Sequence, residues 1–100
     1  MNFRVIYTST FRQDISEHVD YLRDQHVPDD IIERWYDRLF SRIDDLGNWP
    51  KSCPVDEQMT EVIGREVRKL VYARHVVTYH VDEQGRSVQV LTMVHGARRK

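Results

Sequence analysis

The chain has 100 residues, of which 40% are hydrophobic and 31% are charged, and its net charge at pH 7 is -1. This length and composition predict one globular domain over residues 1–100, and they exclude a disordered or a fibrous chain. The chain has no apolar run near the roughly 20 residues that span a membrane, no signal-peptide pattern and one cysteine, Cys53, so we expect it to be cytoplasmic.

The first half of the chain predicts a short strand and two helices. Apolar and polar residues alternate over residues 3–8, as in a strand. Thr10 and Gln13 fit the capping box of a helix that continues to about residue 26. Pro28 suits the first turn of a second helix, which we expect to end at Gly47. The second helix has a wide apolar stripe formed by Ile32, Trp35, Tyr36, Leu39, Phe40, Ile43 and Leu46.

The second half of the chain predicts a loop and then strands. Two prolines without any surrounding periodicity predict a loop over residues 48–60. Segments rich in Val, Tyr and Thr predict strands at 66–73, 75–81 and 87–94. The predicted fold class is therefore α+β: a strand, an antiparallel helical hairpin, then a three- to four-stranded, mainly antiparallel sheet.

Charge is distributed unevenly along the chain. Residues 1–64 hold 7 Lys and Arg against 13 Asp and Glu, whereas residues 65–100 hold 8 against 3. A basic C-terminal part indicates an anionic partner, either nucleic acid or an acidic protein segment. The alternative is a basic sheet that packs beside acidic helices.

The turn between the last two strands sets which residues pair. If Gln84 and Gly85 are its central residues, Thr78 lies opposite Leu91 and Arg74 opposite His95. Polar residues, Arg68, Arg74, His80 and His95 among them, would then share one face. The other face would be a core surface made of Val77, Tyr79, Val81, Val88, Val90, Thr92 and Val94.

Three pieces of this half, in their order and spacing, resemble a known family. They are Val67–Leu70, Arg74–Tyr79 and Val94–Arg98, and together they are similar to the C-terminal half of ParE-like toxins in the RelE/ParE superfamily. The order of elements matches that superfamily over nearly the whole chain. One departure is the loop from Trp49 to Pro54, which lacks the glycine expected after its first proline.

The resemblance implies a toxin of a type II toxin–antitoxin system. Such a toxin is held inactive by an antitoxin whose acidic or amphipathic segment wraps it in a hetero-oligomer. Members that look like ParE poison DNA gyrase, whereas members that look like RelE cut messenger RNA in the ribosome. We expect the ParE-like activity, with the endoribonuclease as the alternative.

Candidate binding residues follow from this reading. Contacts to the antitoxin are expected from Trp35, Tyr36 and Leu39, which helical spacing alone would place in the core. Contacts to an anionic target are expected from the basic residues Arg65, Arg68, Arg74, Arg98 and Arg99.

Catalysis, if present, depends on His95 and Arg74. Metal-free phosphodiester cleavage needs a base, an acid and fixed positive charge on the phosphate. His95 would be the acid or base, while Arg74 and Arg98 would hold the phosphate. The alternative is that His95 ends a strand, the arginines are solvated and nothing is catalysed. His75 and His80 would point to opposite faces of a strand, so we expect no metal and no cofactor.

Overall fold

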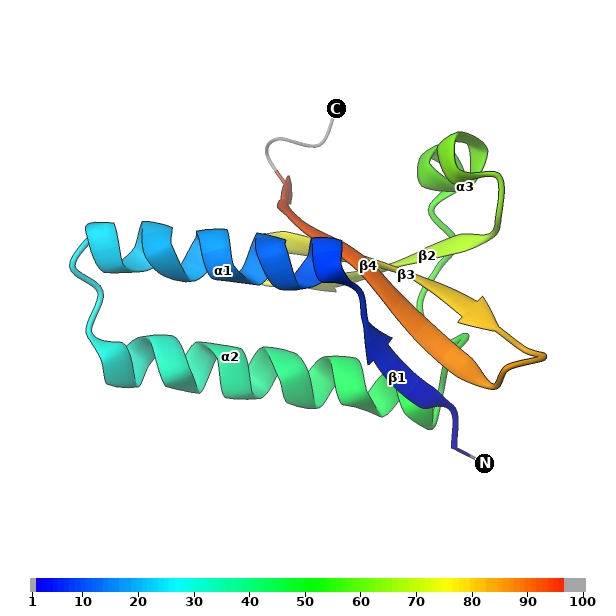
Figure 1. Cartoon of the computed structure of the whole chain (residues 1–100), viewed down its shortest axis with the longest axis horizontal. Coiled ribbons are helices and arrows are strands. Elements are labelled where there is room, and N and C mark those ends of the chain that lie inside the picture. Colours follow the sequence, from blue (N-terminus) through cyan, green and yellow to red (C-terminus); the bar gives the residue numbers. More distant parts are fainter. Residues whose placement is uncertain (1, 97–100) are drawn as a thin grey trace.

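The computed structural model describes residues 2–96 of the chain. Its elements, in chain order, are β1 (Arg4–Tyr7), α1 (Ser9–Asp24), α2 (Asp29–Asp44), α3 (Glu57–Ile63), β2 (Val67–Tyr72), β3 (His75–Asp82) and β4 (Ser87–His95) (Figure 1). A single 3-10 turn at residues 45–47 extends α2. The predicted α+β fold and its helical hairpin are confirmed. None of the helices in residues 2–96 is long and apolar enough to cross a membrane.

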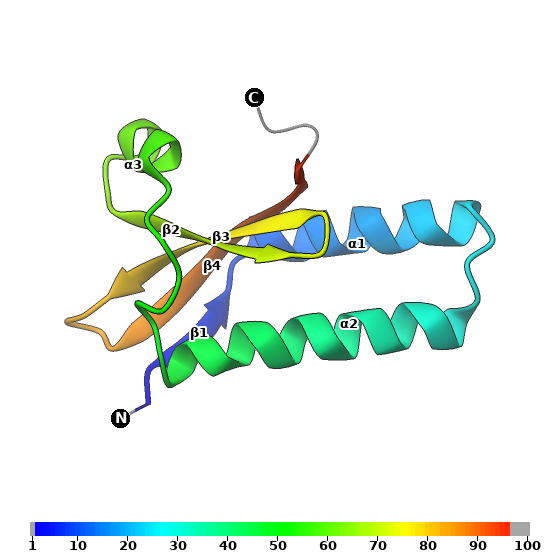
Figure 2. The same ribbon diagram turned by 180° about the vertical axis from the view of Figure 1, so that it is seen from behind.

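One mixed sheet holds all four strands that the structure describes, in the order β1, β4, β3, β2. β1 runs parallel to β4, with Arg4 opposite Ser87 and Tyr7 opposite Val90, and the other neighbours are antiparallel. The first and last strands of the chain therefore lie side by side. α1 and α2 extend to one side of the sheet and α3 lies at the opposite end (Figures 1 and 2).

α1 begins directly after Thr8, whose hydroxyl caps the helix. Thr8 Oγ1 accepts a hydrogen bond from the Phe11 N–H at 3.2 Å and donates to the carbonyl oxygen of Val90 at 2.7 Å. The capping box predicted at Thr10 is wrong, because Thr10 already lies in the first turn of the helix. The actual cap also ties the start of α1 to β4.

The loop predicted over residues 48–60 contains the start of α3, and that part of the prediction is wrong. Asp56 is buried and accepts a hydrogen bond from the Met59 N–H at 3.1 Å, which satisfies one of the free amides of the helix start. Gly64 ends the helix with φ at 84°, in the left-handed region. The aspartate N-cap and the glycine C-cap thus allow a helix to form here despite the nearby prolines.

The predicted pairing of β3 with β4 holds only near their turn. His80 lies opposite Gln89 as expected, but a β-bulge interrupts the register between Thr78 and Tyr79. Beyond it Thr78 lies opposite Thr92, and His75, not Arg74, lies opposite His95. The expected pair of Arg74 with His95 is therefore wrong, because the bulge inserts one extra residue in β4.

The bulge also changes which side chains of β4 face the core. Val77, Tyr79, Val88 and Val90 are fully buried, as expected for that face. After the bulge Met93 is buried, whereas Thr92 and Val94, which were predicted in the core, are only half-buried. The core lies between the sheet and α2, whose buried residues are Ile32, Tyr36, Leu39 and Ile43.

Candidate functional site

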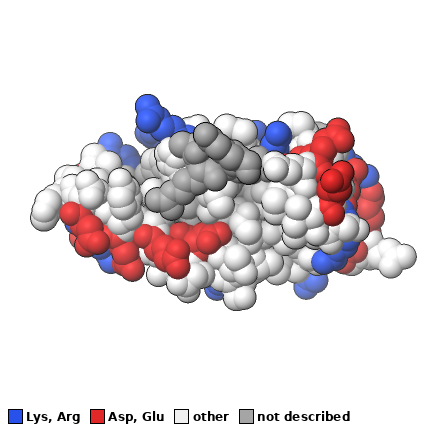
Figure 3. Space-filling view, turned by 90° about the horizontal axis from the view of Figure 1, so that it is seen from above, with Lys and Arg blue, Asp and Glu red and all other residues white. Residues whose placement is uncertain are grey.

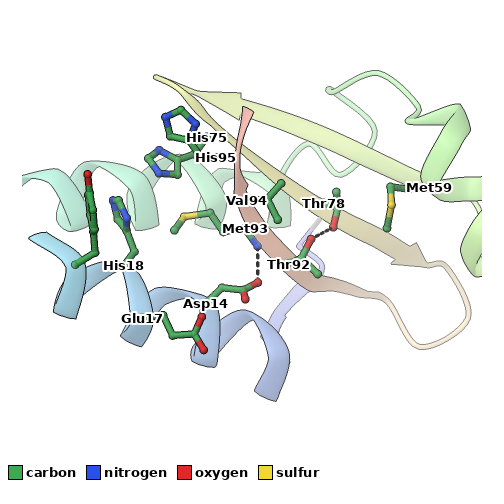
Figure 4. A pocket seen from close by; sticks show the side chains of 11 residues that line it. Asp14, Glu17, His18, Met59, His75, Thr78, Thr92, Met93, Val94 and His95 are labelled. Atoms are coloured by element: carbon green, nitrogen blue, oxygen red, sulfur yellow. Dashed lines mark hydrogen bonds between the residues drawn. The ribbon is translucent and has the colours of Figure 1, made fainter. Parts of the chain in front are cut away.

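Two hollows flank one end of the sheet. The larger, about 660 Å³, lies between α1 and the strands β3 and β4 and reaches Met59 of α3; we call it the α1 hollow (Figure 4). The smaller, about 400 Å³, lies between the two long helices and the β2–β3 turn. Both hollows are lined by Tyr21, His18, His75 and His95.

His18, His75 and His95 form a histidine cluster that separates the two hollows. The ring centres of His18 and His75 are 4.5 Å apart, and those of His75 and His95 are 5.3 Å apart. Trp35 packs on the same rings, 5.2 Å from His75. Three elements, α1, β3 and β4, thus bring together three histidines that are far apart in the chain.

Burial disfavours the charged form of two of these histidines. It lowers the pKa of His75 to about 4, with smaller contributions from the charges of His18 and His95. It also lowers the pKa of His18, again with a smaller contribution from His95. Neutral rings of low pKa are poor proton donors at neutral pH, so His75 is not suited to act as a general acid.

Two carboxylates of α1 line the wall of the α1 hollow (Figure 4). Asp14 accepts a hydrogen bond from the Met93 N–H at 2.9 Å, in the part of β4 that extends past the end of β1. Glu17 accepts one from the Gln13 side chain, also at 2.9 Å. Among the described residues that line this hollow none is a lysine or an arginine.

Acidic side chains gather on the face of the molecule that is seen from above in Figure 3. Figure 3 shows carboxylates gathered in two groups on this face, over α1 and around α3. Three of the eight cations in residues 65–100 are Arg98, Arg99 and Lys100, which lie outside the described residues. The positive charge predicted for the sheet is correspondingly smaller in the part that the structure describes.

The predicted target-binding arginines do not form one patch. Arg68 is partly buried, with its guanidinium 2.7 Å from the Cys53 carbonyl oxygen and 3.2 Å from a Glu66 carboxylate oxygen. It lies opposite Tyr79 and not on the face of His80, so the single polar face predicted from the sequence is wrong. Arg65 precedes β2 and Arg74 follows it, and a strand of this length separates them by roughly 20 Å.

Arg74 does lie near His95, although the two are not paired. The Gly96 N–H donates to the Arg74 carbonyl oxygen at 2.6 Å, and both Arg74 and His95 line the smaller hollow. Arg74 is exposed in the two-residue turn between β2 and β3. The two residues predicted to act on RNA are therefore neighbours, with His75 beside them.

The residues predicted to contact an antitoxin divide between surface and core. Leu39 is fully buried and Tyr36 is buried beneath α1, where its hydroxyl points to the Ile15 carbonyl oxygen at 3.5 Å. Trp35 is half-buried, lines the smaller hollow and packs on Tyr72 of β2. Of these three side chains, Trp35 is the one placed to touch a partner.

The sequence analysis missed the contribution of α1. Asp14, Glu17, His18 and Tyr21 follow the spacing of one helix face, and that pattern was available to mark them as neighbours. Within residues 2–96 no group of three His, Cys, Asp or Glu side chains is placed to hold a metal ion.

Comparison with known proteins identifies the family. Residues 5–100 match the family model described as the ParE toxin of the type II toxin–antitoxin system parDE. The fold is similar to a chain in the crystal structure of the toxin–antitoxin complex RelBE2 from Mycobacterium tuberculosis, with a TM-score of 0.61 and 18% identity over 95% of this chain and 99% of that one. No curated protein matches the chain in sequence. The match over nearly its whole length shows that the chain belongs to the family of ParE toxins of type II toxin–antitoxin systems.

Proposed function

We propose that this toxin arrests growth in the cytoplasm by binding and inhibiting DNA gyrase, and that a cognate antitoxin neutralises it. The observation that supports binding over catalysis is the chemistry of the histidine cluster around His95. Burial depresses the pKa of His75 and His18, the two histidines beside it, and the α1 hollow next to them is lined by the carboxylates Asp14 and Glu17 and by no described lysine or arginine. Cleavage of RNA needs fixed positive charge at the phosphate and a group that carries a proton near pH 7.

The antitoxin contact is proposed at the smaller hollow. Trp35 and Ile31 line it, and Arg74 stands at its rim. An amphipathic segment would place an apolar side chain against Trp35 and a carboxylate near Arg74. The complex named for the similar structure is one of a toxin with an antitoxin, which supports a partner of that kind.

An endoribonuclease that uses His95 and Arg74 is the second candidate. It is favoured by one observation, which is that His75 lies across the strand pair from His95, with ring centres 5.3 Å apart. A second titratable group beside His95 meets one requirement of acid–base catalysis. The neutral state of His75 at pH 7 argues against its use as the acid.

Purified His95→Ala and Arg74→Ala variants separate the two functions. We expect the wild-type chain to inhibit DNA supercoiling by gyrase, His95→Ala to inhibit it equally, and Arg74→Ala to need several times more protein. Arg42→Ala, an exposed arginine at the end of α2, is the matched control for Arg74. Thermal unfolding of each variant checks that the fold is retained.

The same variants are compared in a translation reaction that reports cleavage of messenger RNA. Cleavage by the wild-type chain that disappears in both His95→Ala and Arg74→Ala, together with unaffected gyrase, would overturn the proposal in favour of the endoribonuclease. Inhibition of gyrase that survives the loss of His95 would exclude a catalytic role for that histidine.

A further inference from the structure

We propose that the α1 hollow binds the cationic side chain of an arginine or a lysine carried by a partner peptide. The hollow has room for such a side chain, with a volume of about 660 Å³. This binding site is additional to the proposed inhibition of gyrase, because it recognises a ligand by its positive charge, whichever target the toxin has.

The first argument is the charge of the lining. Asp14 and Glu17 come from one face of α1 and lie on the same wall (Figure 4). Each carboxylate accepts one hydrogen bond from the chain, from the Met93 N–H and the Gln13 side chain respectively. A carboxylate has about four acceptor positions, so both can take further donors from a guanidinium or ammonium group.

The second argument is a buried ring nitrogen without a partner. His75 is 8% exposed, its Nδ1 has no hydrogen-bond partner, and its side chain lines the α1 hollow. Burial lowers the pKa of His75 to about 4, so at pH 7 the ring is neutral and one of its nitrogens presents a lone pair. A buried polar atom left unpaired destabilises the fold, and in the tautomer that carries its proton on Nε2 a donor brought by the ligand would pair with Nδ1 and relieve that penalty.

The third argument is the aromatic and apolar part of the lining. Tyr21 is 55% exposed and stacks on His18 with ring centres 6.1 Å apart, which leaves part of its ring open to a ligand. Aromatic faces attract ammonium and guanidinium groups. Met93 and Val94 form an apolar surface beside it, suited to the methylene stem of a lysine or an arginine.

The test is a titration of the full-length protein with an acetylated hexa-arginine peptide. The ring C–H resonances of His18, His75 and His95 are followed by NMR, since all three rings line the hollow. We expect these resonances to move together, and the affinity to fall as the salt concentration rises. A hexa-glutamate peptide serves as the probe of opposite charge and should leave the rings unchanged.

Variants then assign the binding to the two carboxylates. Glu17→Gln and Asp14→Asn are each expected to weaken binding of hexa-arginine about five- to tenfold. Asp14→Asn removes the charge but keeps the contact with β4, because the amide oxygen that it introduces can still accept from the Met93 N–H. Glu33→Gln, an exposed carboxylate on α2, is the matched control and should bind as the wild type does.

Four outcomes would overturn the proposal. The first is an unchanged affinity for hexa-arginine in both carboxylate variants, and the second is a loss of affinity in Glu33→Gln equal to theirs. The third is tighter binding of hexa-glutamate than of hexa-arginine, and the fourth is binding of spermidine as tight as that of hexa-arginine. A fifth concerns the chain itself. If replacing Arg98, Arg99 and Lys100 by glutamine moves the three histidine resonances before any peptide is added, the hollow serves the protein's own cations and not a partner.

Discussion

His75 shows how the packing of a single residue makes the stability of the fold depend on pH. It is buried against His18 of α1, Trp35 of α2 and His95 of β4, and these ring contacts include no carboxylate that would favour its charged form. Burial lowers the pKa of His75 to about 4, below the value near 6.5 of an imidazole in the unfolded chain. The unfolded chain therefore binds a proton more readily between these two values.

Stability should accordingly fall with acidification. The contribution of His75 to the free energy of unfolding is complete above about pH 6.5 and is lost as the pH decreases to about 4, because protonation of this histidine favours the unfolded state. Urea unfolding at several pH values across this window measures the slope of the unfolding free energy against pH, and His75→Gln should reduce this slope. His26→Asn, at an exposed turn residue with φ at 62°, should leave the slope as it is. An unchanged slope in His75→Gln would contradict this account.

At the scale of the elements, Thr8 joins a strand, a helix and a bulge. Its hydroxyl caps α1 and reaches the carbonyl oxygens of Val90 and Leu91, at 2.7 and 3.1 Å, where β4 departs from regular pairing. Thr8→Ala should cost about 1 to 2 kcal/mol of unfolding free energy, through the lost cap and the lost hydroxyl bond to the Leu91 carbonyl, while the Val90 carbonyl keeps the backbone N–H of residue 8. Thr10→Ala, one helical position inside α1, should change it by less than about 0.5 kcal/mol. Chemical denaturation of both variants compares them directly, and equal losses would argue against the role of Thr8.

The same bulge marks the limit of what the sequence predicts. Periodicity and the turn at Gln84 and Gly85 predict the two long helices, the strands and the pairing of His80 with Gln89, but not α3. The bulge has no such local signal, because it forms where β1 ends and Thr8 bonds to β4, far away in the chain. The pairing of His75 with His95 lies beyond it, so the histidine cluster was out of reach of the sequence.

At the scale of the whole molecule, Gly47 holds the N-terminal strand against the end of the helical hairpin. Its carbonyl oxygen accepts from the Phe3 N–H at 2.7 Å, and a Cβ atom at this position would lie 2.7 Å from the Phe3 carbonyl oxygen. Gly47→Ala should therefore displace the start of β1 and lower the unfolding free energy by about 1 to 3 kcal/mol. Asn48→Ala, at the exposed neighbouring residue, is the control in thermal and urea unfolding. A stable Gly47→Ala variant would show that β1 can shift without cost.

The parallel pairing of β1 with β4 also has a consequence for synthesis of the toxin. β1 is translated well before its partner residues, Ser87 to Val90. The sheet therefore cannot close around β1 until β4 has emerged from the ribosome, and contacts so distant in sequence form slowly. A nascent toxin would thus remain incompletely folded until β4 has emerged, which gives an antitoxin already in the cell time to meet it.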